Sequence, residues 1–202
     1  MFKKILLFVF SAFLLVNFAN AEDFTQHKSL VIYYSLYENR IPLPQNDEVL
    51  AKGSGNAQNI ANLVADLTNA DVFSLHVVKK YPSTYEEVLD VGRKELDEDA
   101  RPAIVDVPNV ANYDTVILVY PNWWGSYPRA VATMLDKVDL SGKNIVPIVT
   151  HEGSKLGRSV QDLKAKLPNS NIVKDCLDIP SKNAHDADLK DKLASYLSSL
   201  EF

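Results

Sequence analysis

Apolar and polar positions follow a regular order from residue 30 to the end of the chain. Short apolar runs typical of buried β-strands occur five times, at residues 30–34, 71–78, 115–120, 144–150 and 172–179. Between and after these runs, apolar residues recur three and four positions apart, as along one face of an α-helix. This spacing predicts five helices, at residues 56–69, 129–137, 159–167 and 187–200, and one that begins after Thr84. Strands and helices therefore alternate along the chain.

This alternation predicts an α/β fold in which helices cover both faces of a parallel sheet, because parallel strands need long crossover connections. A doubly wound topology is the default for such a chain. Ligands of doubly wound sheets bind beyond the carboxyl ends of the strands. Functional residues are therefore expected in the loops that follow Tyr34, Tyr120 and Thr150.

The first 21 residues have the composition of a secretory signal peptide. Two lysines at positions 3 and 4 precede an apolar run at residues 5–18, and Ala19-Asn20-Ala21 offers small residues at a cleavage site. The run is shorter than the ~20 residues that span a bilayer, although a retained membrane anchor is the alternative. We therefore expect a signal peptide at 1–21, a single domain at 22–202, a periplasmic or secreted location, and no stable membrane insertion after cleavage.

Composition excludes several other functions. The 202 residues carry a formal net charge of −5, and loss of residues 1–21 removes two lysines and no acidic residue, which disfavours a nucleic-acid partner. The single cysteine, Cys176, allows no intramolecular disulfide and is expected to pack within the fifth strand. The four histidines show no spacing typical of a metal site.

The first loop ends in Gly53-Ser54-Gly55-Asn56, which leads directly into a helix. Glycine lets a ligand approach the backbone, and the unpaired amides and dipole of a helix N-terminus attract a phosphate. The alternative is that Asn56 merely caps its helix. The segment has neither the P-loop pattern nor the G-x-G-x-x-G pattern.

The loop after Thr150 has the sequence THEGSKLGRS. Its glycines are compatible with close approach to a ligand, and His151 could donate a hydrogen bond or titrate. The alternative is that His151 is a loop residue whose hydrogen bonds are satisfied within the protein.

The loop after the third strand contains two adjacent tryptophans, in the sequence YPNWWGSYPRA. Packing alone is one explanation for such a pair. A flat aromatic ligand with a phosphate tail would instead contact all three loops, with its rings on the indoles. Flavin mononucleotide (FMN) is the ligand that fits this description best.

These motifs together resemble the flavodoxin-like family, in the branch with P-x-W-W-G-x-x-P-R and T-H-x-G-S loops. The resemblance covers nearly all of residues 22–202 and implies a five-stranded sheet of order 2-1-3-4-5 with FMN as cofactor. It assigns the phosphate to Ser35, Gly55, Asn56, Ala57 and Gln58, the flavin ring to Pro121, Asn122, Trp123, Trp124 and Gly125, and a third wall to Thr150, His151, Gly153 and Ser154.

The chain departs from the family pattern in three places. Ala57 stands where a serine or threonine is usual, and Glu152 stands where glycine is common. Residues 36–55 form an insertion between Ser35 and Asn56, which the family's common form joins directly. We expect this insertion to cover the phosphate or to contact a partner.

Three functions remain open from the sequence. The first is an electron-transfer flavoprotein that exchanges electrons with a redox partner protein or a small acceptor. The second is a flavin-dependent reductase of quinone-type acceptors. The third is a binding protein on the same scaffold that holds no flavin, since fold alone does not determine function.

Overall fold

The computed structural model describes residues 28–42 and 54–201, so the expected signal peptide lies outside the described residues. Six strands in this part of the chain form one parallel sheet, in the order β2-β1-β3-β4-β5, with β6 also pairing with β4. Their bounds are β1 (Ser29–Tyr33), β2 (Asp71–Ser74), β3 (Thr115–Pro121), β4 (Asn144–His151), β5 (Asn171–Ile172) and β6 (Leu177–Pro180). The predicted fold class and strand order are confirmed.

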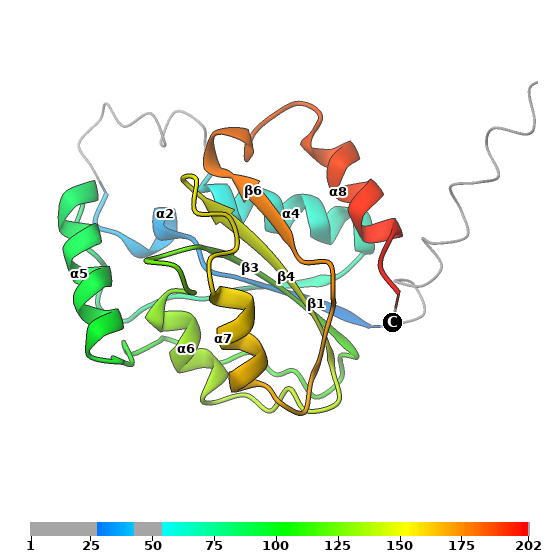
Figure 1. The fold of residues 1–202 in the computed structure, drawn as a ribbon, viewed down its shortest axis with the longest axis horizontal. Coiled ribbons are helices and arrows are strands. Elements are labelled where there is room, and N and C mark those ends of the chain that lie inside the picture. Colours follow the sequence, from blue (N-terminus) through cyan, green and yellow to red (C-terminus); the bar gives the residue numbers. More distant parts are fainter. Residues whose placement is uncertain (1–27, 43–53, 202) are drawn as a thin grey trace, which may run out of the picture.

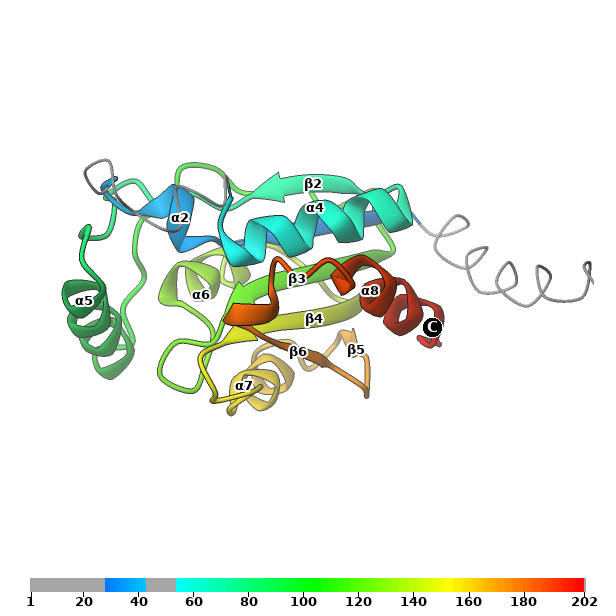
Figure 2. The same cartoon turned by 90° about the horizontal axis from the view of Figure 1, so that it is seen from above.

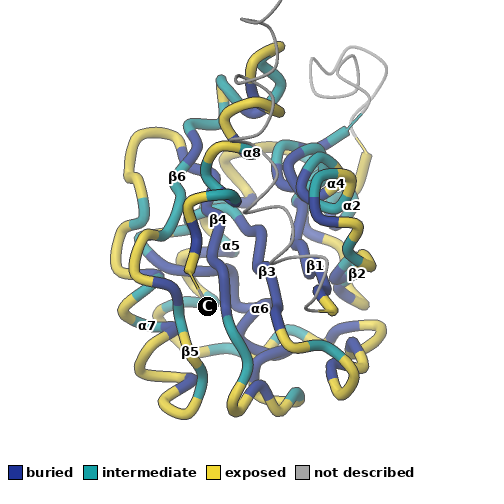
Figure 3. Tube along the Cα trace, turned by 90° about the vertical axis from the view of Figure 1, so that its right-hand side faces the viewer, coloured by how far each residue is buried: buried dark blue, intermediate teal, exposed yellow. Residues whose placement is uncertain are grey.

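Helices cover both faces of the sheet, as predicted (Figure 1). One face carries α4 (Asn56–Thr68) and α8 (Leu189–Ser198), and the other carries α6 (Arg129–Leu135) and α7 (Ser159–Lys166). Successive residues of a strand point to opposite faces, so Leu30 and Ile32 pack with α6 and α7, whereas Val31 packs with α4 and α8. Both faces of the central strands are therefore buried (Figure 3).

The fifth predicted strand is not continuous. The structure divides residues 172–179 between β5 and β6, and Cys176 lies in the turn between them rather than in a strand. Lys174 and Asp175 interrupt the apolar alternation, and the Cys176 thiol approaches the Val173 carbonyl oxygen at 3.4 Å. Cys176 was expected to lie in the fifth strand, and this expectation is wrong. The residue is nevertheless partly buried on the face of the sheet that α8 covers, and this burial raises the pKa of its thiol.

One predicted helix lies in an unexpected place. Helix α5 (Tyr85–Asp97) begins after Thr84, as predicted, and the Thr84 hydroxyl oxygen caps it by accepting a hydrogen bond from the Glu87 amide at 3.4 Å. It lies beyond the carboxyl ends of the strands rather than across a face of the sheet (Figures 1 and 2). Its buried residues, Val88 and Gly92, therefore face the loops at the strand ends.

Two short helical segments were not predicted. Helix α2 (Leu36–Asn39) opens the insertion after β1, and the 3-10 helix η1 (Ser181–Asn183) follows β6. Strand β2 is also shorter than predicted: after Ser74 the chain leaves the sheet, and Val77 pairs with Ile104 in an isolated antiparallel bridge. Within the described residues, no helix has both the length and the apolar character needed to cross a bilayer.

Candidate functional site

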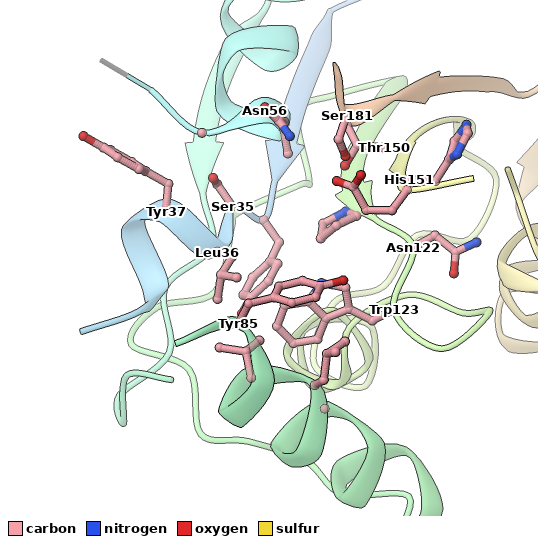
Figure 4. Close-up of a pocket in the computed structure, with 18 of the residues that line it drawn as sticks. Ser35, Leu36, Tyr37, Asn56, Tyr85, Asn122, Trp123, Thr150, His151 and Ser181 are labelled. Atoms are coloured by element: carbon pink, nitrogen blue, oxygen red, sulfur yellow. The ribbon is translucent and has the colours of Figure 1, made fainter. Parts of the chain in front are cut away.

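A cavity of about 650 Å³ opens at the carboxyl ends of β1, β3 and β4. Polar residues of the strand-end loops, among them Ser35, Asn56 and Ser181, lie on one side of it, and Tyr85 and Trp123 lie on the other (Figure 4). The predicted site residues that line it are Ser35, Gly55, Asn56, Ala57, Pro121, Asn122, Trp123, Trp124, Thr150, His151 and Ser154. The structure thus brings the three predicted loops to one cavity. Gln58, Gly125 and Gly153 do not line it.

The N-terminus of α4 meets the loop after β1 at very close range. A Cβ atom added to Gly55 would lie 2.1 Å from the Ser35 hydroxyl oxygen and 2.6 Å from the Tyr37 Cβ, so only glycine fits this position without movement. Gly55 itself occupies the N-cap position and Asn56 is the first helical residue. The alternative role of Asn56 as the helix cap is therefore wrong, and the side chain of Asn56 lies at the cavity wall (Figure 4).

The side chain of Gln58 is engaged inside the protein rather than at the cavity. Its amide oxygen accepts a hydrogen bond from the Gly55 amide at 3.2 Å, and its amide nitrogen donates to the Glu38 carboxylate at 3.1 Å. Any contact of Gln58 with a phosphate would therefore come from the backbone N–H, which belongs to the first turn of α4 and has no partner in the helix ladder.

The two tryptophans sit at the start of a tight turn. The Trp123 amide donates to the Ser126 carbonyl oxygen at 2.8 Å, and the Ser126 amide donates back to Trp123 at 3.0 Å. The two residues between them both have positive φ, 53° at Trp124 and 86° at Gly125. Paired left-handed residues characterise the type I′ turn, which suits glycine but strains a tryptophan.

Trp123 is a packing residue as well as a cavity residue. Its ring meets Tyr34 and Tyr81 edge to face, with centroid separations of 5.7 Å and 5.2 Å. Gly92 of α5 lies against the same indole, since an added Cβ there would be 3.3 Å from it. Burial raises the pKa of Tyr34 and of Tyr81, so this aromatic cluster stays uncharged.

Trp124 has a different environment. Its residue is 45% exposed, and its indole N–H donates to the Leu89 carbonyl oxygen of α5 at 3.1 Å. The guanidinium carbon of Arg93 lies 5.3 Å from the ring centroid, within cation–π range. Trp124 therefore joins the turn to α5 while presenting part of its surface to the cavity.

The hydrogen bonds of His151 are satisfied within the protein, which was the alternative open from the sequence, although the residue ends β4 rather than lying in the loop. Its Nδ1 accepts a hydrogen bond from the Gly153 amide at 2.8 Å, so the proton must reside on Nε2, which donates to the Asp178 carboxylate at 2.9 Å. Glu152 beside it is exposed and lines the cavity. Among the described residues, no group of histidine, cysteine and acidic side chains could hold a metal ion.

The second and third loops are joined to one another. The backbone N–H of Asn122 donates to the Thr150 carbonyl oxygen at 2.7 Å, and the side-chain nitrogen of Asn122 donates to the Lys155 carbonyl oxygen at 2.8 Å. The Arg158 amide donates to the Gly125 carbonyl oxygen at 2.7 Å. The two walls of the cavity are therefore one connected unit.

Sequence reasoning missed two parts of the cavity. Ser181 and Lys182 of η1 line it, and the Asn59 side chain of α4 ties this segment down by donating to the Ala184 carbonyl oxygen at 2.8 Å. The loop after β6 is also at a strand's carboxyl end, so the same rule could have found it. Tyr85, Val88, Leu89 and Gly92 of α5 were missed because the sequence does not reveal where that helix lies.

The insertion contributes through its described residues. Leu36, Tyr37 and Arg40 line the cavity, so these residues of the insertion form part of its wall. The rest of it, from residue 43 to 53, lies outside the described residues.

The fold and the cavity together define a doubly wound α/β protein with a cavity at the carboxyl ends of its strands. Residues 49–195 match the family model described as Flavodoxin, and the chain belongs to this family. A comparison with curated proteins gave no match.

Several solved structures are similar to this chain. A candidate flavoprotein from Bacteroides eggerthii is 23% identical with a TM-score of 0.65, over 85% of this chain and 96% of the other. A candidate flavoprotein from Bacteroides uniformis is 20% identical with a TM-score of 0.67, over 86% and 99%. A flavoprotein from Lactobacillus acidophilus, crystallised in complex with FMN, is 17% identical with a TM-score of 0.59, over 83% and 99%. At these identities the similarity establishes the fold.

Proposed function

We propose that this protein binds FMN in the strand-end cavity and acts as an electron-transfer flavoprotein. The observation that carries the proposal is the single cavity that joins the N-terminus of α4 to the tryptophan turn and the Thr150 loop. Membership of the flavodoxin family and the FMN bound by the Lactobacillus acidophilus relative support the choice of cofactor. When bound, FMN supplies the redox chemistry, and the protein supplies binding, orientation and charge.

The cavity residues fit the two ends of FMN. Ser35 and Gly55 line one end of the cavity next to the first-turn amides of α4, and this end, called the cradle below, suits a phosphate. Lys182 adds a cation, which compensates in part for the hydroxyl that Ala57 lacks. The indoles of Trp123 and Trp124 offer aromatic surface for the flavin ring.

The cavity wall carries charges of both signs. Glu152 is exposed at the wall, and Arg40 and Lys182 line the same cavity. The Glu152 carboxylate would disfavour an anionic reduced flavin, because like charges repel in a partly desolvated site, whereas the two cations would favour it. A redox partner protein or a small electron acceptor would receive the electrons of the reduced flavin.

Titration of the ligand-free protein with FMN tests the proposed function. Flavin fluorescence should be quenched on binding, because the ring stacks on indoles, and the titration should saturate at one FMN per chain. Isothermal calorimetry on the same sample checks the stoichiometry. An unquenched, non-saturating titration would contradict the proposal and favour a flavin-free binding protein on the same scaffold.

We further propose that the mature protein works outside the cytoplasm, after cleavage between Ala21 and Glu22. The composition of residues 1–21 supports this location. N-terminal sequencing of exported protein should therefore begin at Glu22. A mature chain that retains residues 2–18 would instead indicate a membrane anchor. The location also makes a reductase that uses nicotinamide nucleotides less favourable than an electron carrier, because those cofactors are generally cytoplasmic.

A further inference from the structure

We infer that Glu38, in the insertion after β1, is a positioning residue that sets the preference of the cavity for a phosphate-bearing flavin over riboflavin. This inference rests on the proposed binding of FMN. It concerns a side chain outside the cavity lining, which acts on the cradle at Gly55 and Ser35 through hydrogen bonds.

The Glu38 carboxylate joins three elements of the fold. One oxygen accepts hydrogen bonds from the Tyr33 hydroxyl of β1 and from the Gln58 side chain of α4, each at 3.1 Å. The other oxygen accepts from the Ser74 hydroxyl of β2 at 3.1 Å. A carboxylate that accepts three side-chain hydrogen bonds holds its donors in fixed positions, because hydrogen bonds to charged groups are stronger than neutral ones.

Gln58 passes this restraint to the start of α4. Its amide nitrogen donates to Glu38, so its amide oxygen faces the other way and accepts from the Gly55 amide. Gly55 is the N-cap residue of α4 and packs directly against the Ser35 side chain. The orientation of the first turn of α4 is therefore coupled to Glu38 through a chain of two hydrogen bonds.

Asn39 fixes the opposite side of the cradle. This residue is 1% exposed, and its amide nitrogen donates to the Ser35 carbonyl oxygen at 2.8 Å and to the Leu75 carbonyl oxygen at 2.9 Å. Its amide oxygen accepts from the Val77 amide at 2.8 Å. Helix α2 is thus anchored rigidly next to Ser35, so Glu38 has a fixed base from which to hold Gln58 and Gly55.

The consequence differs for the two ends of the ligand. The Glu38 network reaches the cradle where the phosphate would lie, whereas the tryptophan turn is held by Leu89, Ser126 and the Thr150 loop. Loss of the network should therefore weaken binding of the phosphate end and leave the ring contacts in place. Riboflavin, which has the ring but no phosphate, separates these effects.

The experiment measures the affinities of FMN and riboflavin for wild type, Glu38→Ala and Glu38→Gln by fluorescence titration. Glu38→Ala should lower FMN affinity about tenfold, the equivalent of ~1.4 kcal/mol, with riboflavin affinity unchanged. Glu38→Gln should keep the wild-type ratio of the two affinities. Its oxygen can still accept from Tyr33 and Gln58, and its amide nitrogen can donate to Ser74.

Asp136→Ala is the matched control. Asp136 is also a carboxylate with two side-chain partners, Arg101 and Lys166, but it does not line the cavity. The Asp136→Ala variant should keep the wild-type ratio of FMN affinity to riboflavin affinity, even if the variant is less stable. The inference is overturned if Glu38→Ala keeps the wild-type ratio, or if Asp136→Ala lowers it equally. Wild-type protein that binds neither flavin would instead overturn the proposed function, and this inference with it.

Discussion

Replacement of Trp123 by alanine is expected to lower the free energy of unfolding by about 2–3 kcal/mol, less than the cost of removing a fully buried aromatic side chain, because Trp123 is partly buried and lines the cavity. The reason is the packing of its indole, which contacts Tyr34, Tyr81 and Gly92 on three different segments. The cavity left behind would separate α5 from the strand-end loops. Chemical denaturation of the purified variant measures this loss directly.

Trp124→Ala is the comparison that makes the result specific. Trp124 is 45% exposed and has one side-chain hydrogen bond, to Leu89, so its loss should cost about 1 kcal/mol of stability or less. FMN affinity should nevertheless fall by about 1–2 kcal/mol, because aromatic contact with the ring is lost. Equal stability losses in the two variants would contradict the distinction between a packing and a surface tryptophan.

The second large effect is expected at Gly157, where the third loop meets the tryptophan turn. Its φ is +54°, and an added Cβ would lie 2.5 Å from the Gly125 carbonyl oxygen and 2.7 Å from the Asn122 side chain. Gly157→Ala should lower the free energy of unfolding by about 2–4 kcal/mol, as the sum of backbone strain and overpacking. FMN affinity should fall as well, because the clash would push apart the two loops that form the ring side of the cavity.

Gly142→Ala separates strain from clash. Gly142 has a φ of +74° but nothing within 4 Å of an added Cβ, so alanine there should cost only the strain, about 1–2 kcal/mol. It also lies away from the cavity and should leave FMN affinity unchanged. Denaturation and titration of both variants provide the comparison. Identical behaviour of the two would show that the contact between the loops is unimportant.

The hydrophobic pattern was sufficient for the main elements of the fold. Residues 116–119 of β3 form an unbroken apolar run because both faces of that strand are buried, and this run is visible in the sequence. The predicted helix at 56–69 agrees with α4 to within one residue, because its apolar face has a clear helical period. The pattern failed at residues 172–179, where two polar residues divide one apparent strand into β5 and β6.

The sequence predicted which loops form the site but not how the side chains of these loops contact one another. Ligands lie at the carboxyl ends of parallel strands, which predicts that the loops of Ser35, Trp123 and Thr150 meet, and all three residues line one cavity. The same rule would also have included Ser181, had the loop after the fifth strand been weighed. The glycine pattern at Gly55 indicated close approach, although not that Ser35 is the group approached.

The sequence by itself determined the doubly wound sheet and the loops that form the cavity, because these depend on local periodicity and on glycine and aromatic positions along the chain. The strand order was implied by the resemblance to a family. Only the tertiary structure decided that Trp123 packs inward while Trp124 is exposed, that α5 lies beyond the strand ends, and that Glu38 holds Gln58. Each of these depends on contacts between segments far apart in the chain, such as Gly92 with Trp123 or Glu38 with Ser74. Such contacts leave no periodic signal in the sequence, since they arise only when the sheet has brought the segments together.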